Sequence, residues 1–261
     1  MAIINKRSKI EIFKDVIFAI FVRDIKSNFN DKLGLSWSVV SPLLFIMVLT
    51  LIRGSMDGGE THTMPTYYFM AYGILLVRFF MECTTNVSNA IANNKSLFSF
   101  RQVQPSSAFI ASSLFELISK FLVAIIIIFI GFMLNVESAL HNSLGILYIF
   151  MLTWLMSVSV GIFFALARCY VPEVTKIRSF ILRPLIFLSG AFFSLKDIPM
   201  EYWHFFTWNP ILHSIEFTRD FSSSTYNAEG VSFLFLNMTT FSMLFIAMCC
   251  YQAVWKKAIS R

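Results

Sequence analysis

The sequence predicts an all-α integral membrane protein with six transmembrane helices, an N-terminal cytoplasmic interface helix and a re-entrant helical hairpin before the last span. The chain has 261 residues, of which 57% are hydrophobic, and its mean hydropathy is +0.69. These values lie far above those of soluble domains. Apolar runs of about 20 residues, the length that crosses a bilayer core of about 30 Å, recur along the chain. Basic residues gather in alternate connections between these runs, as in a multi-pass protein.

Six segments within a transmembrane domain of residues 33–255 are long and apolar enough to span a membrane. They are residues 33–52, 66–89, 108–134, 143–167, 174–193 and 231–255.

Residues 1–32 are predicted to form the interface helix, because apolar residues recur there at helical spacing among many charges. The apolar positions are Ile10, Phe13, Ile17 and Ile20. We expect this helix to lie on the cytoplasmic surface. A solvated helix docked on a partner protein is the alternative.

The distribution of Lys and Arg predicts the orientation of the chain. The N-terminal segment, the connections near residues 93–107 and 168–178 and the tail at 256–261 carry most of them, whereas residues 54–65 and 135–143 carry none. Arg53 is the main exception. The positive-inside rule then places both termini in the cytoplasm and the hairpin outside. The net charge of +6 is explained by this topology, so we expect no nucleic-acid partner.

Residues 197–221 are predicted to form the re-entrant hairpin. Asp197 is expected to cap a first helix with Pro199 in its first turn, and Asn209–Pro210 to begin a second. Pieces of about 10 and 12 residues are about 15 and 18 Å long, too short to cross the bilayer alone. Backbone at that depth persists only against protein or a wet cavity, so the hairpin suggests a pathway entrance. Two amphipathic helices on the membrane surface are the alternative.

Two pairs of opposite charges lie four residues apart inside predicted spans, and so can pair on one helix face. They are Arg78 with Glu82 and Glu116 with Lys120. Structural ion pairs that face a neighbouring helix are the favoured interpretation, since charges inside a membrane need partners.

Arg183 has no acid at helical spacing in the fifth span, and Arg178 lies one to two turns nearer the cytoplasm. One hypothesis is that the two guanidinium groups line an inner vestibule and attract an anionic substrate. The alternative is that they extend to the inner lipid headgroups.

No metal site and no catalytic residues are predicted. Glu201 with His204 and His213 with Glu216 each share a helix face, but they lack the further carboxylates of a di-metal bundle. No phosphate-binding loop motif occurs. If ATP powers the protein, the ATPase is therefore another chain.

Five short motifs, taken in order, resemble the permease subunit of ABC-2 type exporters for capsular polysaccharide, over about residues 10–255. The resemblance is to the capsule and polysialic-acid branch of Gram-negative bacteria, with Vi-type capsule and O-antigen exporters as similar relatives. The motifs are Leu33–Trp37 with Pro42, Asn94–Pro105, Val171–Glu173, Ile198–Trp203 and Trp208–Glu216.

This resemblance implies a transport subunit of the bacterial inner membrane and not an enzyme. It implies a homodimer that works with two ATP-binding subunits, so that ATP and Mg²⁺ bind the partner ATPase and this chain holds no cofactor. The implied cargo is a lipid-linked anionic polysaccharide, with membrane lipids around the protein and periplasmic and outer-membrane export proteins as further partners.

The resemblance also assigns a coupling segment that sits in a groove of the ATPase. Its residues are Asn94, Lys95, Leu97, Phe98, Phe100, Arg101 and Pro105. The apolar members can fill the groove while the two cations reach acids on its rim. Gln102 and Gln104 stand where Pro and Lys are common in the family, which affects partner choice. A plain turn with a buried Leu–Phe pair is the alternative.

The hairpin corresponds to the family's outer gate. The gate residues are Tyr202, Trp203, Trp208, Asn209, Pro210, His213 and Glu216. Aromatic residues that can stack on sugar rings along the substrate path are Trp37, Tyr67, Tyr68 and Tyr72, although most aromatic residues of such a chain belong to the core or the interface belt.

Export of a lipid-linked capsular polysaccharide is the leading functional prediction. The alternatives are an ABC-2 permease for an O-antigen, a teichoic acid or a drug, and, from another class, a membrane enzyme that acts on lipid-linked sugars.

Overall fold

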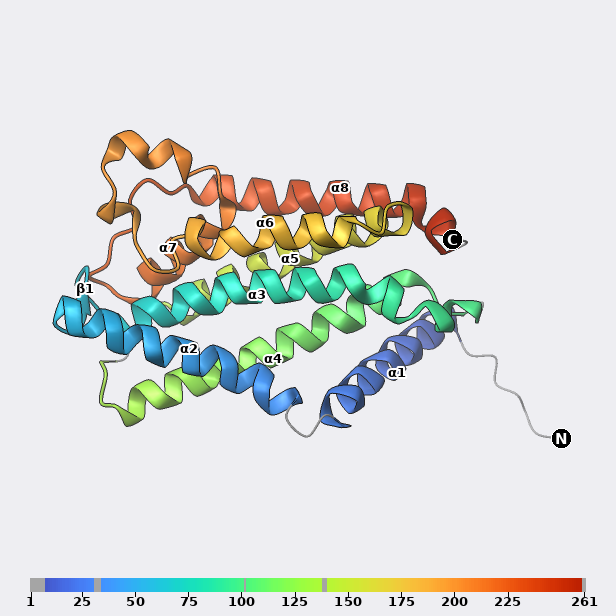
Figure 1. The fold of residues 1–261 in the computed structure, drawn as a ribbon, viewed down its shortest axis with the longest axis horizontal. Helices are drawn as coiled ribbons and strands as arrows, with labels where there is room; N and C mark the ends of the chain where they lie inside the picture. Colours follow the sequence, from blue (N-terminus) through green and yellow to red (C-terminus); the bar gives the residue numbers. More distant parts are fainter. Residues whose placement is uncertain (1–7, 31–33, 101, 138–139, 260–261) are drawn as a thin grey trace.

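The computed structural model describes residues 8–30, 34–100, 102–137 and 140–259, which form a bundle of long helices (Figure 1). A two-residue strand pair, β1 with β2, joins α2 to α3. The elements are α1 (Lys9–Asn30), α2 (Gly34–Asp57), β1 (Glu60–Thr61), β2 (Met64–Pro65), α3 (Thr66–Asn93), the 3₁₀ helix η1 (Lys95–Ser99), α4 (Pro105–Met133), α5 (Ser143–Tyr170), α6 (Val174–Leu188), the 3₁₀ helices η2 (Leu195–Asp197) and η3 (Met200–Phe205), α7 (Pro210–Ser222) and α8 (Phe233–Ile259).

The all-α membrane architecture is confirmed, and four of the described helices are long and apolar enough to cross a bilayer by themselves. Those stretches are Val39–Asp57, Pro105–Met133, Ser143–Tyr170 and Phe233–Lys256. α3 has 28 residues but carries several polar side chains. The six-span count therefore stays a prediction.

α6 is shorter than the predicted segment 174–193, and the prediction was wrong at the C-terminal end of this segment. The helix stops at Leu188 after 15 residues, and so is about 22 Å long. Ser189–Ser194 follow in a non-helical conformation, with Gly190 at a φ of +69°. Glycine adopts this left-handed conformation without steric cost, and it commonly ends helices.

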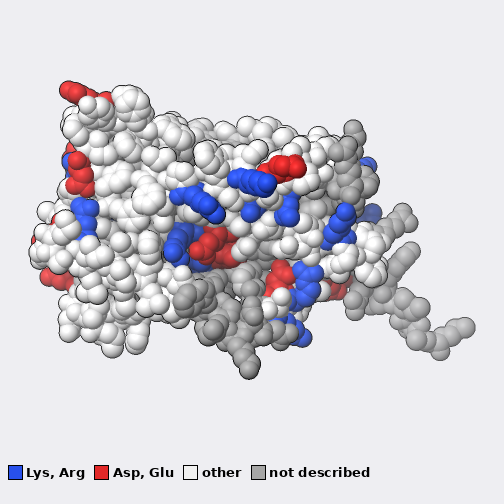
Figure 2. Space-filling view, in the orientation of Figure 1, with Lys and Arg blue, Asp and Glu red and all other residues white. Residues whose placement is uncertain are grey.

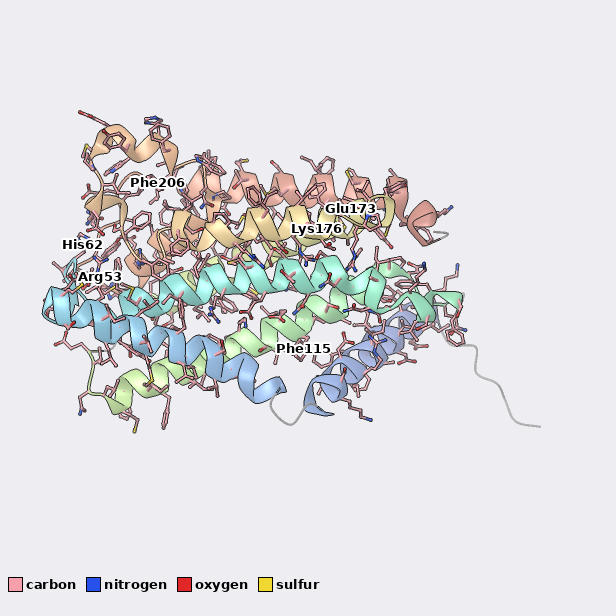
Figure 3. The ribbon with its side chains drawn as sticks, viewed as in Figure 1. Arg53, His62, Phe115, Glu173, Lys176 and Phe206 are labelled. Atoms are coloured by element: carbon pink, nitrogen blue, oxygen red, sulfur yellow. The ribbon has the colours of Figure 1, made fainter. Side chains whose placement is uncertain are left out.

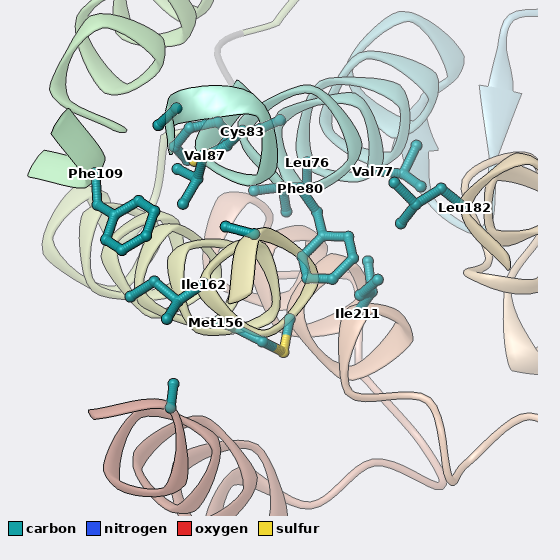
Figure 4. Close-up of a cluster of buried hydrophobic side chains, with 14 of the residues drawn as sticks. Leu76, Val77, Phe80, Cys83, Val87, Phe109, Met156, Ile162, Leu182 and Ile211 are labelled. Carbon is teal, nitrogen blue, oxygen red and sulfur yellow. The ribbon is translucent and has the colours of Figure 1, made fainter. Parts of the chain in front are cut away.

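α3 is the centre of the bundle, with α2, α4, α5, α6 and α7 packed around it (Figure 1). Figure 4 shows the main apolar cluster, in which residues of α3 such as Leu76 and Phe80 meet Met156 of α5 and Ile211 of α7. A helix enclosed by protein can carry polar side chains that pair across its interfaces. This position explains why α3 can carry more polar side chains than α2, α4 and α8, the candidate spans that are mostly exposed.

The polar side chains of α3 form an ion-pair network with α4. The two predicted pairs are present: Arg78 and Glu82 lie 3.9 Å apart, and so do Lys120 and Glu116. The Lys120 ammonium also bonds Glu82, and Asn86 donates to Glu116. These bonds between helices support the structural interpretation of both pairs.

α1 packs along α4 and also touches α2. Ile20 is buried, and Ile17 packs against the main apolar cluster. Ile10 is exposed, so the predicted apolar stripe covers only the later turns of the helix. Its position on the membrane surface stays a prediction.

Candidate functional site

The hairpin region begins differently from the prediction. Ser194, not Asp197, caps the first turn: the Ser194 hydroxyl accepts from the Lys196 N–H, and the Asp197 carboxylate accepts from the Ser194 N–H at 2.9 Å. The first predicted helix of about 10 residues is replaced by two 3₁₀ turns, η2 and η3. Their tighter hydrogen bonding suits short segments of this kind.

The second predicted helix of this region begins and ends as predicted. The Asn209 side chain accepts from the Ile211 N–H at 3.0 Å, and Pro210 takes the first helical position of α7. Pro is favoured there because its missing N–H would have no helical partner. α7 has 13 residues and ends at Ser222, where the predicted serine cluster begins.

A buried polar cluster, which we name the Arg219 cluster, holds α7 in place. It comprises Ser194, Glu216, Arg219 and Tyr226. The Arg219 guanidinium, whose side chain has 0% exposure, lies 3.1 Å from a Glu216 oxygen. Tyr226 donates to the other Glu216 oxygen at 2.5 Å, and Ser194 lies 2.8 Å from the Tyr226 hydroxyl. Burial and then the Glu216 charge raise the pKa of Tyr226, which keeps this donor protonated.

The same guanidinium group serves three backbone carbonyls. It donates to the carbonyls of Phe69, Ala191 and Phe193 at 3.1–3.3 Å, and it stacks on the Phe69 ring at 3.5 Å. Arg carries five N–H donors in a rigid fork, so one side chain can satisfy several acceptors. Arg219 was not identified as a site residue from the sequence.

Two more side chains donate to carbonyls at the last residue of α6 and in the non-helical segment after it. Asn209 donates to the Leu188 carbonyl at 3.2 Å, and Arg53 of α2 donates to the Phe192 carbonyl at 2.7 Å. Backbone carbonyls inside a membrane must find donors from protein or trapped water. α2 and α7 therefore both stabilise the broken end of α6.

Arg53, the exception in the charge pattern, belongs to an ion cluster at this end of the bundle (Figure 3). Its guanidinium lies 2.7 Å from Asp57 and 3.7 Å from Asp197. His62 lies 2.8 Å from Asp197. The partners explain how an arginine is tolerated at the edge of a loop that otherwise lacks basic residues.

The predicted gate residues divide into buried and exposed groups. His213 is buried; its Nδ1 accepts from the Ser232 N–H at 3.0 Å, so Nε2 carries the hydrogen that it donates to the Thr207 carbonyl at 2.7 Å. Both imidazole nitrogens are thus occupied, which leaves neither for a metal ion. The Trp203 indole donates to Ile198, whereas Tyr202 and Trp208 are exposed.

The tyrosines proposed for the substrate path are packed inside this chain. Tyr67 donates to the Ile127 carbonyl at 2.8 Å, and Tyr68 stacks on Tyr72 with ring centroids 6.0 Å apart. All three are buried, which favours a core role over direct contact with sugars. The Trp37 side chain lies outside the described part of the structure.

The two arginines of the predicted vestibule line one cavity of about 560 Å³ along α6, together with Lys176. Arg178 is buried and anchored on α3, where it donates to Ser88 and to Asn89, which also accepts from Arg168. Arg183 is exposed. Lys176 lies along α6 in Figure 3, and Figure 2 shows Lys and Arg side chains over the middle of this face, with some Asp and Glu side chains among them. The cavity thus has a cationic lining in which the Arg178 guanidinium is held by hydrogen bonds and the Arg183 side chain is exposed.

The predicted coupling segment forms a tight turn between α3 and α4. Asn94 is buried and donates to the Ala90 carbonyl at 2.8 Å, and Pro105 takes the first position of α4. Leu97 and Phe98 are half-buried against the main apolar cluster, whereas Phe100 is 62% exposed. Lys95 is also exposed, and Arg101 lies outside the described residues. The turn thus buries a Leu–Phe pair and also presents an apolar ring to the outside.

Comparison with known proteins assigns the family. The family model described as "ABC-2 type transporter" matches residues 15–222. The chain is 31% identical over 250 residues to the polysialic acid transport protein KpsM of Escherichia coli, covering 94% of this chain and 96% of that protein. It is 24% identical to the capsule polysaccharide export inner-membrane protein CtrC of Neisseria meningitidis serogroup A, covering 80% and 79%. It is 25% identical to the O-antigen export permease RfbA of Klebsiella pneumoniae, covering 85% of each. The chain therefore belongs to the ABC-2 type transporter family, as a membrane-spanning transport protein and not an enzyme.

Proposed function

We propose that this protein is the permease subunit of an ATP-driven exporter that carries a lipid-linked capsular polysaccharide across the bacterial inner membrane. The observation that carries the proposal is the 31% identity to a polysialic acid transport protein along 94% of the chain. Two permease copies and two ATP-binding subunits form the transporter, with ATP and Mg²⁺ bound to the ATPase. Both termini face the cytoplasm, and the chain crosses the membrane six times.

Coupling to the ATPase is assigned to the turn at Asn94–Pro105. Phe100 supports this assignment, because the turn exposes its aromatic ring and also exposes Lys95, which together suit an apolar groove with an acidic rim. Leu97 and Phe98 instead hold the turn on its own bundle. Phe100 is therefore the residue whose side chain a partner contacts first.

The cationic cavity along α6 supports an anionic cargo. Arg183 and Lys176 are exposed there, and the buried Arg178 adds a positive charge that the nearby amide and hydroxyl groups hold in place. Arg is well suited to carboxylate and phosphate groups because its planar fork binds two oxygens at once. Acid groups of the polymer or phosphate of its lipid anchor fit this surface.

The test of coupling is copurification of the ATPase in mild detergent, with Phe100→Asp beside the unmodified chain. We expect Phe100→Asp to lose the ATPase while the permease stays folded. Met200→Asp is the matched control, because Met200 is 72% exposed, somewhat more than Phe100, but lies in η3 at the other end of the bundle. ATPase retention by Phe100→Asp would move the coupling surface elsewhere.

The test of export is surface capsule in cells that lack the native permease and receive this chain. Restored capsule with an intact glycan identifies the cargo class. O-antigen is the second candidate, favoured by the 25% identity to the Klebsiella permease. Restored O-antigen without restored capsule would select that candidate, and restoration of neither would overturn the proposal.

A further inference from the structure

An apolar cavity of about 320 Å³ lies between α4 and α5, with α3 as its inner wall. Tyr72, Leu75 and Leu76 of α3 are buried at its base. Phe121 and Ile125 of α4 lie at its rim and are 47% and 49% exposed. The cavity thus runs from the outer surface of the bundle to residues that are almost completely enclosed.

The lining offers water very few partners. Among the polar side chains of the lining, Thr218 already donates to the Ser214 carbonyl at 2.8 Å, and Ser143 donates to the Leu140 carbonyl. Other lining residues are mainly aliphatic or aromatic, as Ile128 and Leu147 illustrate. Buried water needs two to four polar partners, and apolar cavities stay dry. If the cavity were empty, the side chains that line it would lack the dispersion contacts that a bound apolar group provides.

The depth of the cavity matches membrane hydrocarbon. Ile128 lies five residues before Met133, the last residue of α4, and Phe121 lies twelve residues before it. At about 1.5 Å per residue, the cavity therefore lies between about 8 and 18 Å from the C-terminal end of that helix. Half of a bilayer core is about 15 Å thick. α4 and α5 have the two highest mean hydropathies of the four described candidate spans, 2.5 and 2.2, so the rim faces acyl chains.

We propose that this cavity binds one acyl chain of a membrane phospholipid, inserted sideways between α4 and α5. A methylene group occupies about the same volume as a water molecule, roughly 30 Å³. The cavity volume of about 320 Å³ therefore accommodates about ten methylene groups. Under the orientation proposed above, the phospholipid belongs to the periplasmic leaflet, because the cavity lies in the half of the bundle that holds α7. The site is distinct from the cationic cavity along α6 and takes a lipid tail instead of a charged group.

The experiment uses the full transporter in nanodiscs that contain a phospholipid with a photoreactive diazirine on its acyl chain, followed by peptide mapping. We expect labels on Leu75 and Leu76, which are at most 4% exposed and which lipids on the outer surface cannot reach. Ala124→Trp fills the cavity and should abolish these labels, while labels on the exposed Phe245 of α8 persist.

Leu122→Trp is the matched control, because Leu122 is 47% exposed on α4 but does not line the cavity. We expect it to keep the labels on Leu75 and Leu76. If Ala124→Trp does not fold, Ile128→Phe serves as a smaller filling variant. Labels confined to exposed residues, or labels on Leu76 that survive cavity filling, would overturn the proposal.

Discussion

Replacing Arg219 by Met tests whether the Arg219 cluster stabilises the end of the bundle that holds α7. The substitution leaves the Glu216 carboxylate buried without its counter-ion and removes the guanidinium donor from three backbone carbonyls. Breaking a buried ion pair by removing one partner costs about 3–5 kcal/mol. For a chain of this size each kcal/mol shifts the melting temperature by about 2–4 °C. We therefore expect Arg219→Met to lower the melting temperature by about 6–20 °C.

Thermal unfolding of the purified permease in detergent, followed by intrinsic fluorescence, measures the shift. Arg183→Met is the control: that side chain is exposed, so its loss should change stability by about 0.5 kcal/mol or less. Adding Glu216→Gln to Arg219→Met removes the stranded charge and should recover part of the lost stability. A melting temperature within 2 °C of the unmodified protein, or a double variant less stable than Arg219→Met, would refute the reasoning.

Two further predictions concern the same end of the bundle and the cationic cavity. Gly73→Ala would place a Cβ 2.5 Å from the Ala191 carbonyl oxygen, so we expect a loss of about 1–3 kcal/mol in the free energy of unfolding. Gly54→Ala lies inside α2 and has nothing within 4 Å of the new Cβ, so it should stabilise the protein by up to about 1 kcal/mol, because alanine favours a helix over glycine. Equal melting temperatures for the two variants would contradict this. Arg183→Gln should reduce surface capsule at equal permease levels, and Arg183→Lys, which keeps the charge but loses the planar fork, should reduce it less. Quantitative capsule staining measures both, and unchanged capsule in Arg183→Gln would exclude a role for this charge in export.

The helices could be predicted from local patterns, and the end of α6 shows where those patterns stop. The apolar run continues through Phe192 and Phe193, so hydropathy alone extends the helix to residue 193. Gly190 was the available signal for an earlier stop. The non-helical conformation also depends on donors from Arg53 and Arg219, which are far away in sequence. Local sequence propensity cannot predict these long-range contacts.

The buried ion pairs were only partly predicted from the sequence, both between helices and within α7. The spacing of Glu116 and Lys120 predicted their pairing, yet the bond from Lys120 to Glu82 of another helix was not predictable from either segment. Glu216 was expected at an outer gate, and its i,i+3 spacing to Arg219 was the signal that could have revealed the buried pair. The tyrosines of α3 were predicted to line the substrate path, but they are buried in the core. An aromatic side chain suits both environments, so the sequence alone did not distinguish them.

The non-helical segment after α6 has a consequence for how the chain is inserted into the membrane. Arg53 precedes this segment in the chain, but Asn209 and Arg219 are synthesised after it. Until α7 emerges from the ribosome, the carbonyls of Leu188, Ala191 and Phe193 lack these side-chain donors, and hydrocarbon offers no substitute. We therefore expect the segment to stay near water during insertion and to enter its final position together with α7. A nascent chain that ends before Arg219 lacks the group that stabilises this part of the fold.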